Sequence, residues 1–246
     1  MKKLLSHKLK EHELKEGKAL KRIIISLSFI LFFSTNVVLA EELTEQKQIL
    51  VEGNEKEGVY LYATPNPKDE LFTDFEVRIG KEIFETYGWN APMREERKPE
   101  LHVVDLNKDG QKEIVVIITI GTGTWVVQKE AHIIQQVETI DGKVYEEMDI
   151  ENPVHTIERD FKITATNKTI QVKGRGHIWN AENSCGKTYY RHRFPFYQSV
   201  NWKVEGNQLV ANVGLTLTHN CVPAGFVLKY KQKGEIYVVK KIKVNL

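Results

Sequence analysis

The sequence predicts a mainly β protein, built from antiparallel sheets and hairpins behind an N-terminal signal peptide. Two observations favour the β class. From residue 90 onward, short segments alternate apolar and polar residues, and none shows convincing helical periodicity. Turn-forming pairs such as Asp141-Gly142 and Gly206-Asn207 separate these segments, which is the spacing expected of hairpins. A sandwich of antiparallel sheets fits this pattern.

The first forty residues have the layout of a secretory signal peptide. Residues 1–22 are basic, residues 23–33 are almost entirely apolar, and the following segment ends in the small residue Ala40. An uncleaved membrane anchor is the alternative, although polar residues interrupt a run that should contain about twenty apolar residues to span a bilayer. In either case, residues after 40 would lie outside the cytoplasm. We expect a secreted or cell-surface protein that contacts the membrane only through this segment, if it stays uncleaved.

Removing this segment reverses the net charge. The chain has 35 basic and 33 acidic residues, of which 8 and 3 lie in residues 1–40; 27 basic and 30 acidic residues remain, a net charge of −3. The basic character therefore belongs to the export signal. A nucleic-acid partner is not expected.

The best-defined motif is the acidic segment 105–113, with the sequence DLNKDGQKE, between two apolar runs. Oxygen-bearing side chains alternate with spacers and can converge on one point, and Gly110 stands where the loop must turn sharply. Hard oxygen donors in this number suit Ca²⁺. The predicted ligands are Asp105, Asn107, Asp109, the main-chain carbonyl of Gln111, and Glu113.

The flanking residues distinguish this motif from an EF-hand. An EF-hand loop needs an acid at its twelfth position, which is Val116 here, and residues 113–120 form a β-branched run. Residues 101–120 instead resemble the calcium loops of FG-GAP/VCBS repeats, the blades of integrin-type propellers. That resemblance implies a strand–loop–strand calcium site in an adhesion or recognition module. With one such loop and about 206 residues after the signal, only part of a propeller is expected. The alternative is a solvated Asn/Asp/Gly turn.

Two cysteines follow the signal segment, Cys185 and Cys221. An even number of cysteines in an exported chain favours a disulfide. A zinc site that also uses His192 and His219 is the alternative, but Cys-x₆-His and His-x-Cys are not the spacings of structural zinc sites.

Aromatic, basic and histidine residues are concentrated between residues 174 and 197. Such residues suit recognition of an extracellular protein, a glycan or an anionic cell-wall polymer; a loop packed on the β core is the alternative. The candidate binding surface consists of His177, Trp179, Tyr189, Tyr190, Arg191, His192 and Arg193.

Catalytic motifs are weakly represented, because no nucleophile elbow and no HExxH sequence occurs. The sequence therefore favours a non-enzymatic binding or structural protein with one Ca²⁺ loop. A hydrolase that uses residues 177–219 and a secreted enzyme inhibitor are the alternatives. The predicted organisation is a signal peptide (1–40), a polar lead-in (41–57), a β region with the calcium loop (58–152) and a β region with the disulfide (153–246).

Overall fold

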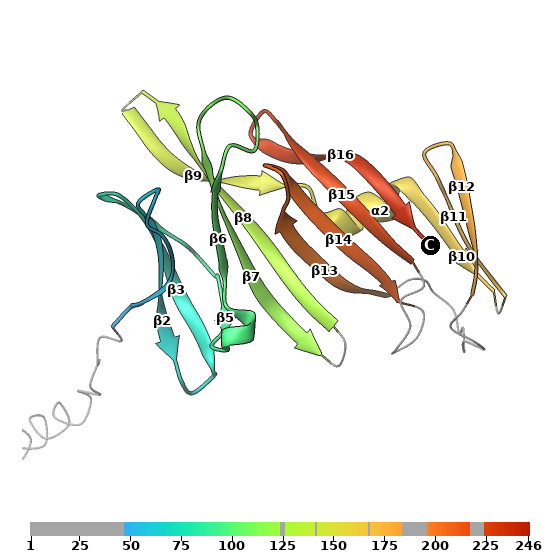
Figure 1. Ribbon diagram of the computed structural model, residues 1–246, viewed down its shortest axis with the longest axis horizontal. Coiled ribbons are helices and arrows are strands. Elements are labelled where there is room, and N and C mark those ends of the chain that lie inside the picture. The colour runs from blue at the N-terminus through green and yellow to red at the C-terminus, as the bar shows by residue number, and fades with distance from the viewer. Residues whose placement is uncertain (1–46, 124–125, 141, 167, 184–195, 217–223) are drawn as a thin grey trace, which may run out of the picture. The chain divides into compact units, whose positions relative to one another are not determined.

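The computed structural model describes residues 47–123, 126–140, 142–166, 168–183, 196–216 and 224–246 (Figure 1). The predicted signal peptide and both cysteines lie outside these ranges. Residues 47–246 form one compact unit. Among the described residues, no helix is long and apolar enough to cross a membrane.

The prediction of a mainly β protein with antiparallel sheets is confirmed. The first sheet has the order β1-β2-β3-β4, and the short strand β5 also pairs with β3. Its first strand lies within the segment predicted to be a polar lead-in. The strands are β1 (Ile49–Asn54), β2 (Val59–Asn66), β3 (Leu71–Ile79), β4 (Glu82–Glu85) and β5 (Ala91–Pro92), and the 3₁₀ helix η1 (Glu95–Arg97) follows them.

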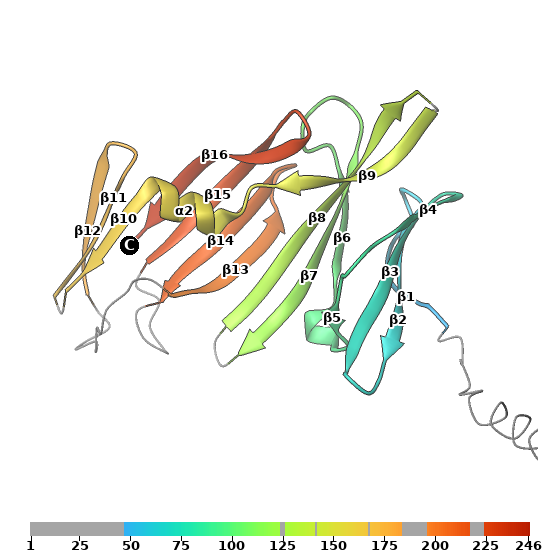
Figure 2. The same cartoon turned by 180° about the vertical axis from the view of Figure 1, so that it is seen from behind.

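The second sheet has eight strands in the order β13-β14-β15-β16-β9-β8-β7-β6. Strand β13 also pairs with β8, where Val200 lies opposite Gln128, so six of the strands form a closed ring. The strands are β6 (Glu100–Val104), β7 (Glu113–Gly123), β8 (Val126–Thr139), β9 (Gly142–Ile150), β13 (Phe196–Val204), β14 (Leu209–Thr216), β15 (Ala224–Lys233) and β16 (Ile236–Asn245). Figure 2 shows them from the opposite side.

The third sheet consists of β10 (Phe161–Ala165), β11 (Thr169–Gly174) and β12 (His177–Glu182). Its apolar face packs on the closed ring of strands, where the centroids of the Phe161 and Phe226 side chains are 5.3 Å apart. This packing joins the two halves of the chain through one core, which contains Val115 as well as Phe226.

The expectation that no helix follows residue 90 is wrong. Helix α2 (Pro153–Asp160) begins at the boundary predicted between the two β regions. Asn152 caps the helix, because its Oδ1 accepts hydrogen bonds from the N–H groups of Val154 (2.9 Å) and His155 (3.1 Å). Pro153 occupies the first helical position, which its fixed φ favours. Eight residues are too few for helical periodicity to stand out in the sequence.

Strand β7 is buried on both faces, which explains its uninterrupted apolar sequence. Val115 and Ile117 belong to the core of the closed ring. Ile114, Val116 and Ile118 belong to a second core, formed with the first sheet. A strand with one buried and one exposed face alternates apolar and polar residues, whereas a strand between two cores is apolar throughout. The acidic loop is therefore attached to one of the best-anchored strands of the protein.

Candidate functional site

The acidic loop connects β6 to β7, as the sequence predicted. The two strands are antiparallel neighbours, with Val104 opposite Glu113 at the base of the loop. Within the loop, Lys108 and Gly110 have positive φ values of 69° and 91°. The turn at the glycine uses the conformation that glycine adopts most readily. The loop thus joins two antiparallel strands, and calcium binding stays a prediction.

Main-chain N–H groups fix the polar side chains of this loop. The carboxylate of Asp105 accepts from the N–H groups of Lys108 (2.6 Å) and Gly110 (3.1 Å). Asn107 Oδ1 accepts from Asp109 N–H at 2.9 Å. Asp109 Oδ1 in turn accepts from the N–H of Gln111 at 2.7 Å. The loop backbone therefore holds the side-chain oxygens of Asp105, Asn107 and Asp109 in defined orientations.

Glu113 is the most unusual residue of the loop, because its side chain is fully buried. Its Oε2 accepts a hydrogen bond from Leu106 N–H at 2.7 Å, but its Oε1 is buried without a hydrogen-bond partner among the described residues. Burial raises the pKa of this carboxyl group, against the opposing effect of the Leu106 N–H, and Asp109 and Asp105 raise the pKa further. A buried carboxylate normally has a basic partner or a metal. In the described part of the chain, Glu113 forms no ion pair.

Tyr237 of β16 belongs to the same neighbourhood. Its hydroxyl is also buried and has no hydrogen-bond partner among the described residues. Burial raises the pKa of this hydroxyl, and the negative charges of Glu113, Asp109 and Asp105 act in the same direction. Within the described residues, two buried polar atoms without hydrogen-bond partners, Glu113 Oε1 and the Tyr237 hydroxyl oxygen, thus belong to the surroundings of one acidic loop.

A chain of amides ties the loop to the ring. Asn107 Nδ2 donates to Gln232 Oε1 at 2.7 Å, and Gln232 Nε2 donates to Gln135 Oε1 at 2.9 Å. Asn107 Nδ2 also donates to Asp109 Oδ2 at 2.8 Å. No local pattern in the sequence points to Gln232 or Tyr237, since more than a hundred residues separate them from the loop.

The donors suit a hard cation in kind: carboxylates, an amide oxygen and a main-chain carbonyl. Among the residues that the structure describes, however, no three His, Cys, Asp or Glu side chains gather closely enough to hold one metal ion. Mutual repulsion keeps carboxylates apart, and a divalent cation between them reverses that repulsion. The orphaned Oε1 of Glu113 is the feature that fits a cation directly.

The candidate binding surface is described only at His177 and Trp179, both in β12. His177 is exposed, and its ring centroid lies 5.5 Å from that of Trp179. Trp179 packs against Phe161 and the core, which favours a structural role. Beside His177 lies an open hollow of about 640 Å³, lined by residues 158–162 and 173–178. The other five residues of this surface, together with Cys185, Cys221 and His219, lie outside the described ranges.

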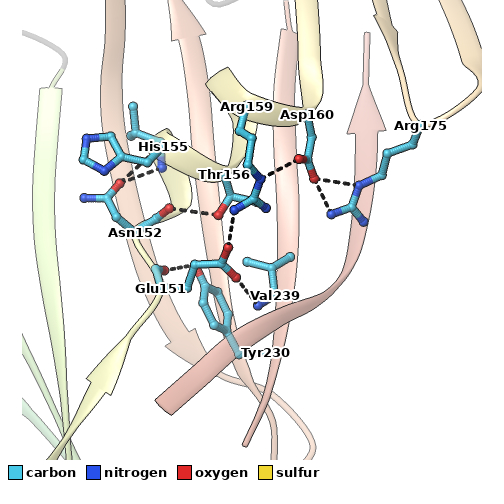
Figure 3. Close-up of polar contacts among 10 residues, drawn as sticks. Glu151, Asn152, His155, Thr156, Arg159, Asp160, Arg175, Tyr230 and Val239 are labelled. Atoms are coloured by element: carbon cyan, nitrogen blue, oxygen red, sulfur yellow. Dashed lines mark hydrogen bonds and ion pairs between the residues drawn. The ribbon is translucent and has the colours of Figure 1, made fainter. Parts of the chain in front are cut away.

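Figure 3 shows a second polar cluster, around helix α2. Glu151 accepts from Arg159 Nη1 (2.9 Å) and from the N–H of Val239 (2.8 Å). Asp160 accepts from Arg159 Nε (2.8 Å) and from Arg175 Nε and Nη2 (2.9 and 2.6 Å). Because both oxygens of each carboxylate are engaged, this cluster fixes α2 between β9, β16 and the β11–β12 turn.

No family model, curated protein or solved structure matches this chain.

Proposed function

We propose that this chain is an exported, non-enzymatic β-rich binding or structural protein that binds one Ca²⁺ ion at residues 105–113. The observation that supports the proposal best is Glu113, a fully buried acid with an unpartnered oxygen at the end of a loop of oxygen donors. Leaving a buried polar atom unsatisfied costs about 1–3 kcal/mol, and more for a charged group. A bound cation removes that cost.

The ligands of the proposed site are the five residues expected from the sequence: Asp105, Asn107, Asp109, the Gln111 carbonyl and Glu113. When bound, Ca²⁺ supplies the positive charge that neutralises the buried carboxylate. Ca²⁺ accepts irregular sets of six to eight oxygens, whereas Mg²⁺ requires near-octahedral geometry and retains its waters. A loop anchored by its own main chain suits the more tolerant ion.

The resemblance to FG-GAP/VCBS calcium loops supports a recognition or adhesion role. The strand–loop–strand arrangement of β6 and β7 is consistent with it. Export follows from the signal-peptide layout of residues 1–40, and cleavage after Ala40 gives a mature N-terminus at Glu41. N-terminal sequencing of the exported protein tests this part, since a mature form that begins at Met1 contradicts cleavage.

Thermal unfolding tests the calcium part. At a Ca²⁺ concentration ten times the Kd, the expected stabilisation is about 1.4 kcal/mol. For a compact unit of this size, about 1.4 kcal/mol corresponds to a rise in Tm of roughly 3–6 °C. Extracellular calcium modules have Kd values of about 10⁻⁴–10⁻³ M, so about 10 mM Ca²⁺ is sufficient. Mg²⁺ at the same concentration should stabilise less.

The variant Asp109→Ala should remain folded and lose the response to Ca²⁺. The matched control is Asp149→Ala, which removes an exposed acid from β9 and should keep the full response. Identical transitions of the wild type in Ca²⁺ and in chelator would reduce the loop to an ordinary turn. An equal response in both variants would place the ion elsewhere.

A further inference from the structure

The outward face of the β15–β16 hairpin carries a row of lysines. In β15, Phe226, Leu228 and Tyr230 point into the core, so Lys229 and Lys231 lie on the opposite face. In β16, the residues that pack on the core include Val239, Ile242 and Val244. A register shift leaves Lys240 without a paired residue in β15, between Val239 and Lys241, and beyond it Lys241 and Lys243 take the outward positions.

The strand register brings these lysines together. Lys229 lies directly opposite Lys241, Lys243 lies opposite Val227, and Lys231 lies opposite Val238. The four lysines thus occupy three successive outward levels of the hairpin. Two residues of a strand rise by roughly 6.8 Å, so the charges extend over roughly 14 Å along the strands. We call Lys229, Lys231, Lys241 and Lys243 the lysine stripe.

None of the four stripe lysines forms an ion pair within the described part of the chain, where the lysines that do so are Lys98, Lys112, Lys129 and Lys203. On the neighbouring strand β14, the residues in register are uncharged: Val210, which is fully buried, lies opposite Lys229, and Asn212 lies opposite Val227. On the other side, β9 pairs with β16 only at Ile236 and Tyr237, where Asp149 lies opposite Ile236. Like charges directly opposite one another in a sheet are destabilising. The stripe is thus a concentrated positive field on a chain whose residues 41–246 are net negative.

We propose that the lysine stripe binds a linear polyanion that carries a phosphate group in each repeat. Lysines at a regular spacing along a rigid hairpin match charges that recur along a polymer, and such contacts add through multivalency. The residues in register with the stripe are Val210, which is fully buried, and Asn212, Val227 and Val238, which are partly buried. None of them carries an aromatic ring on which a base could stack, which disfavours single-stranded nucleic acid. The proposal is independent of the calcium loop.

Salt dependence gives the proposal a quantitative test with long-chain inorganic polyphosphate as the probe. Each lysine–phosphate contact on a single-stranded polymer contributes about −0.7 to the slope of log K against log[salt]. Four contacts give a slope of about −2.8, so binding should weaken about 50-fold between 50 and 200 mM salt. The double variant Lys229→Gln/Lys241→Gln should have half this slope, so that its binding to polyphosphate weakens only about 7-fold over the same range of salt concentration.

The matched control is Lys162→Gln/Lys173→Gln. These two lysines also lie directly opposite one another, in β10 and β11, and their removal changes the net charge by the same amount. The control should bind polyphosphate within about twofold of the wild type and keep its slope. Equal losses in the two double variants would show that binding follows net charge and would overturn the assignment to the stripe.

Three further measurements complete the test. Lys229→Arg/Lys241→Arg retains the charges and should retain binding; loss of binding would contradict an electrostatic stripe. If the glutamine variant of this pair aggregates in light scattering, Lys231→Gln/Lys243→Gln removes the other half of the stripe and should halve the slope in its place. The third measurement uses vesicles of anionic phospholipid. If the wild type binds these vesicles but not polyphosphate, and the stripe variant does not bind them, the partner is a membrane surface and not a polymer.

Discussion

Replacing Glu113 by glutamine separates the effect of charge from the effect of shape. The amide keeps an oxygen that can accept from Leu106 N–H, a bond of 2.7 Å in the wild type. It removes the negative charge that is buried near Asp105 and Asp109. In chelator, Glu113→Gln should therefore be at least as stable as the wild type, since relief of burial and repulsion offsets any loss of hydrogen bonding.

Calcium should reverse this order. At about ten times the Kd, the wild type gains about 1.4 kcal/mol, whereas the variant, which lacks the closing carboxylate, gains close to nothing. The difference in stability between the wild type and Glu113→Gln therefore shifts by about 1.4 kcal/mol, or roughly 3–6 °C in Tm, between chelator and Ca²⁺.

Urea denaturation in about 10 mM Ca²⁺ and in chelator measures the free energy of unfolding of the wild type and of Glu113→Gln under both conditions. Glu146→Gln, which removes an exposed acid of β9, is the control and should behave as the wild type does. A role of the Glu113 charge in binding Ca²⁺ is excluded if Glu113→Gln gains as much from Ca²⁺ as the wild type, or if the variant is destabilised equally with and without the ion.

Three other changes have defined outcomes. Gly174→Ala should destabilise the fold by about 1–3 kcal/mol in urea denaturation, because its Cβ would lie 2.3 Å from the main-chain oxygen of Asp160. Gly121→Ala, whose Cβ would meet its nearest neighbour at 3.7 Å, should have little effect; equal losses would contradict the close approach. Hydrogen bonds from two arginines lower the pKa of Asp160 below its ordinary 3.8, so its contribution to stability is present above about pH 4 and is lost as the pH falls through the lowered value. Asp160→Asn should flatten that part of the stability–pH profile, and an unchanged profile would contradict the role of the ion pairs. Thiol labelling of the denatured, unreduced protein should find Cys185 and Cys221 unreactive, whereas two free thiols would exclude the disulfide.

The class of fold and the position of the acidic loop could be read from local sequence. The apolar run after Glu113 predicts a buried strand, and β7 is such a strand. Gly110 predicts a sharp turn, and its φ is positive. Both signals depend on residues within about ten positions of one another, which is the range over which patterns are informative.

Helix α2 was missed although its start is marked in the sequence. Asn152 followed by Pro153 is a combination of N-cap and first helical residue as well as a turn signal. The helix has only two turns, and its burial through Ile157 depends on strands that come from other parts of the chain. Tertiary packing rather than local propensity therefore decides this segment.

The surroundings of the loop could not be predicted for the same reason. Tyr237 and Gln232 reach the loop only because the sheet closes into a ring. The lysine stripe likewise depends on register, since only the pairing of β15 with β16 sets Lys229 opposite Lys241. Long-range pairing of this kind is not encoded in any short pattern.

Isothermal titration of the purified protein with Ca²⁺ measures directly whether the chain binds the ion. We expect saturable binding of one ion per chain, with a Kd of about 10⁻⁴–10⁻³ M. We also expect that this binding is lost in Asp109→Ala and retained in Asp149→Ala. Absence of any binding heat up to about 10 mM Ca²⁺, ten times the upper end of that Kd range, together with an unchanged Tm, would contradict binding of the ion.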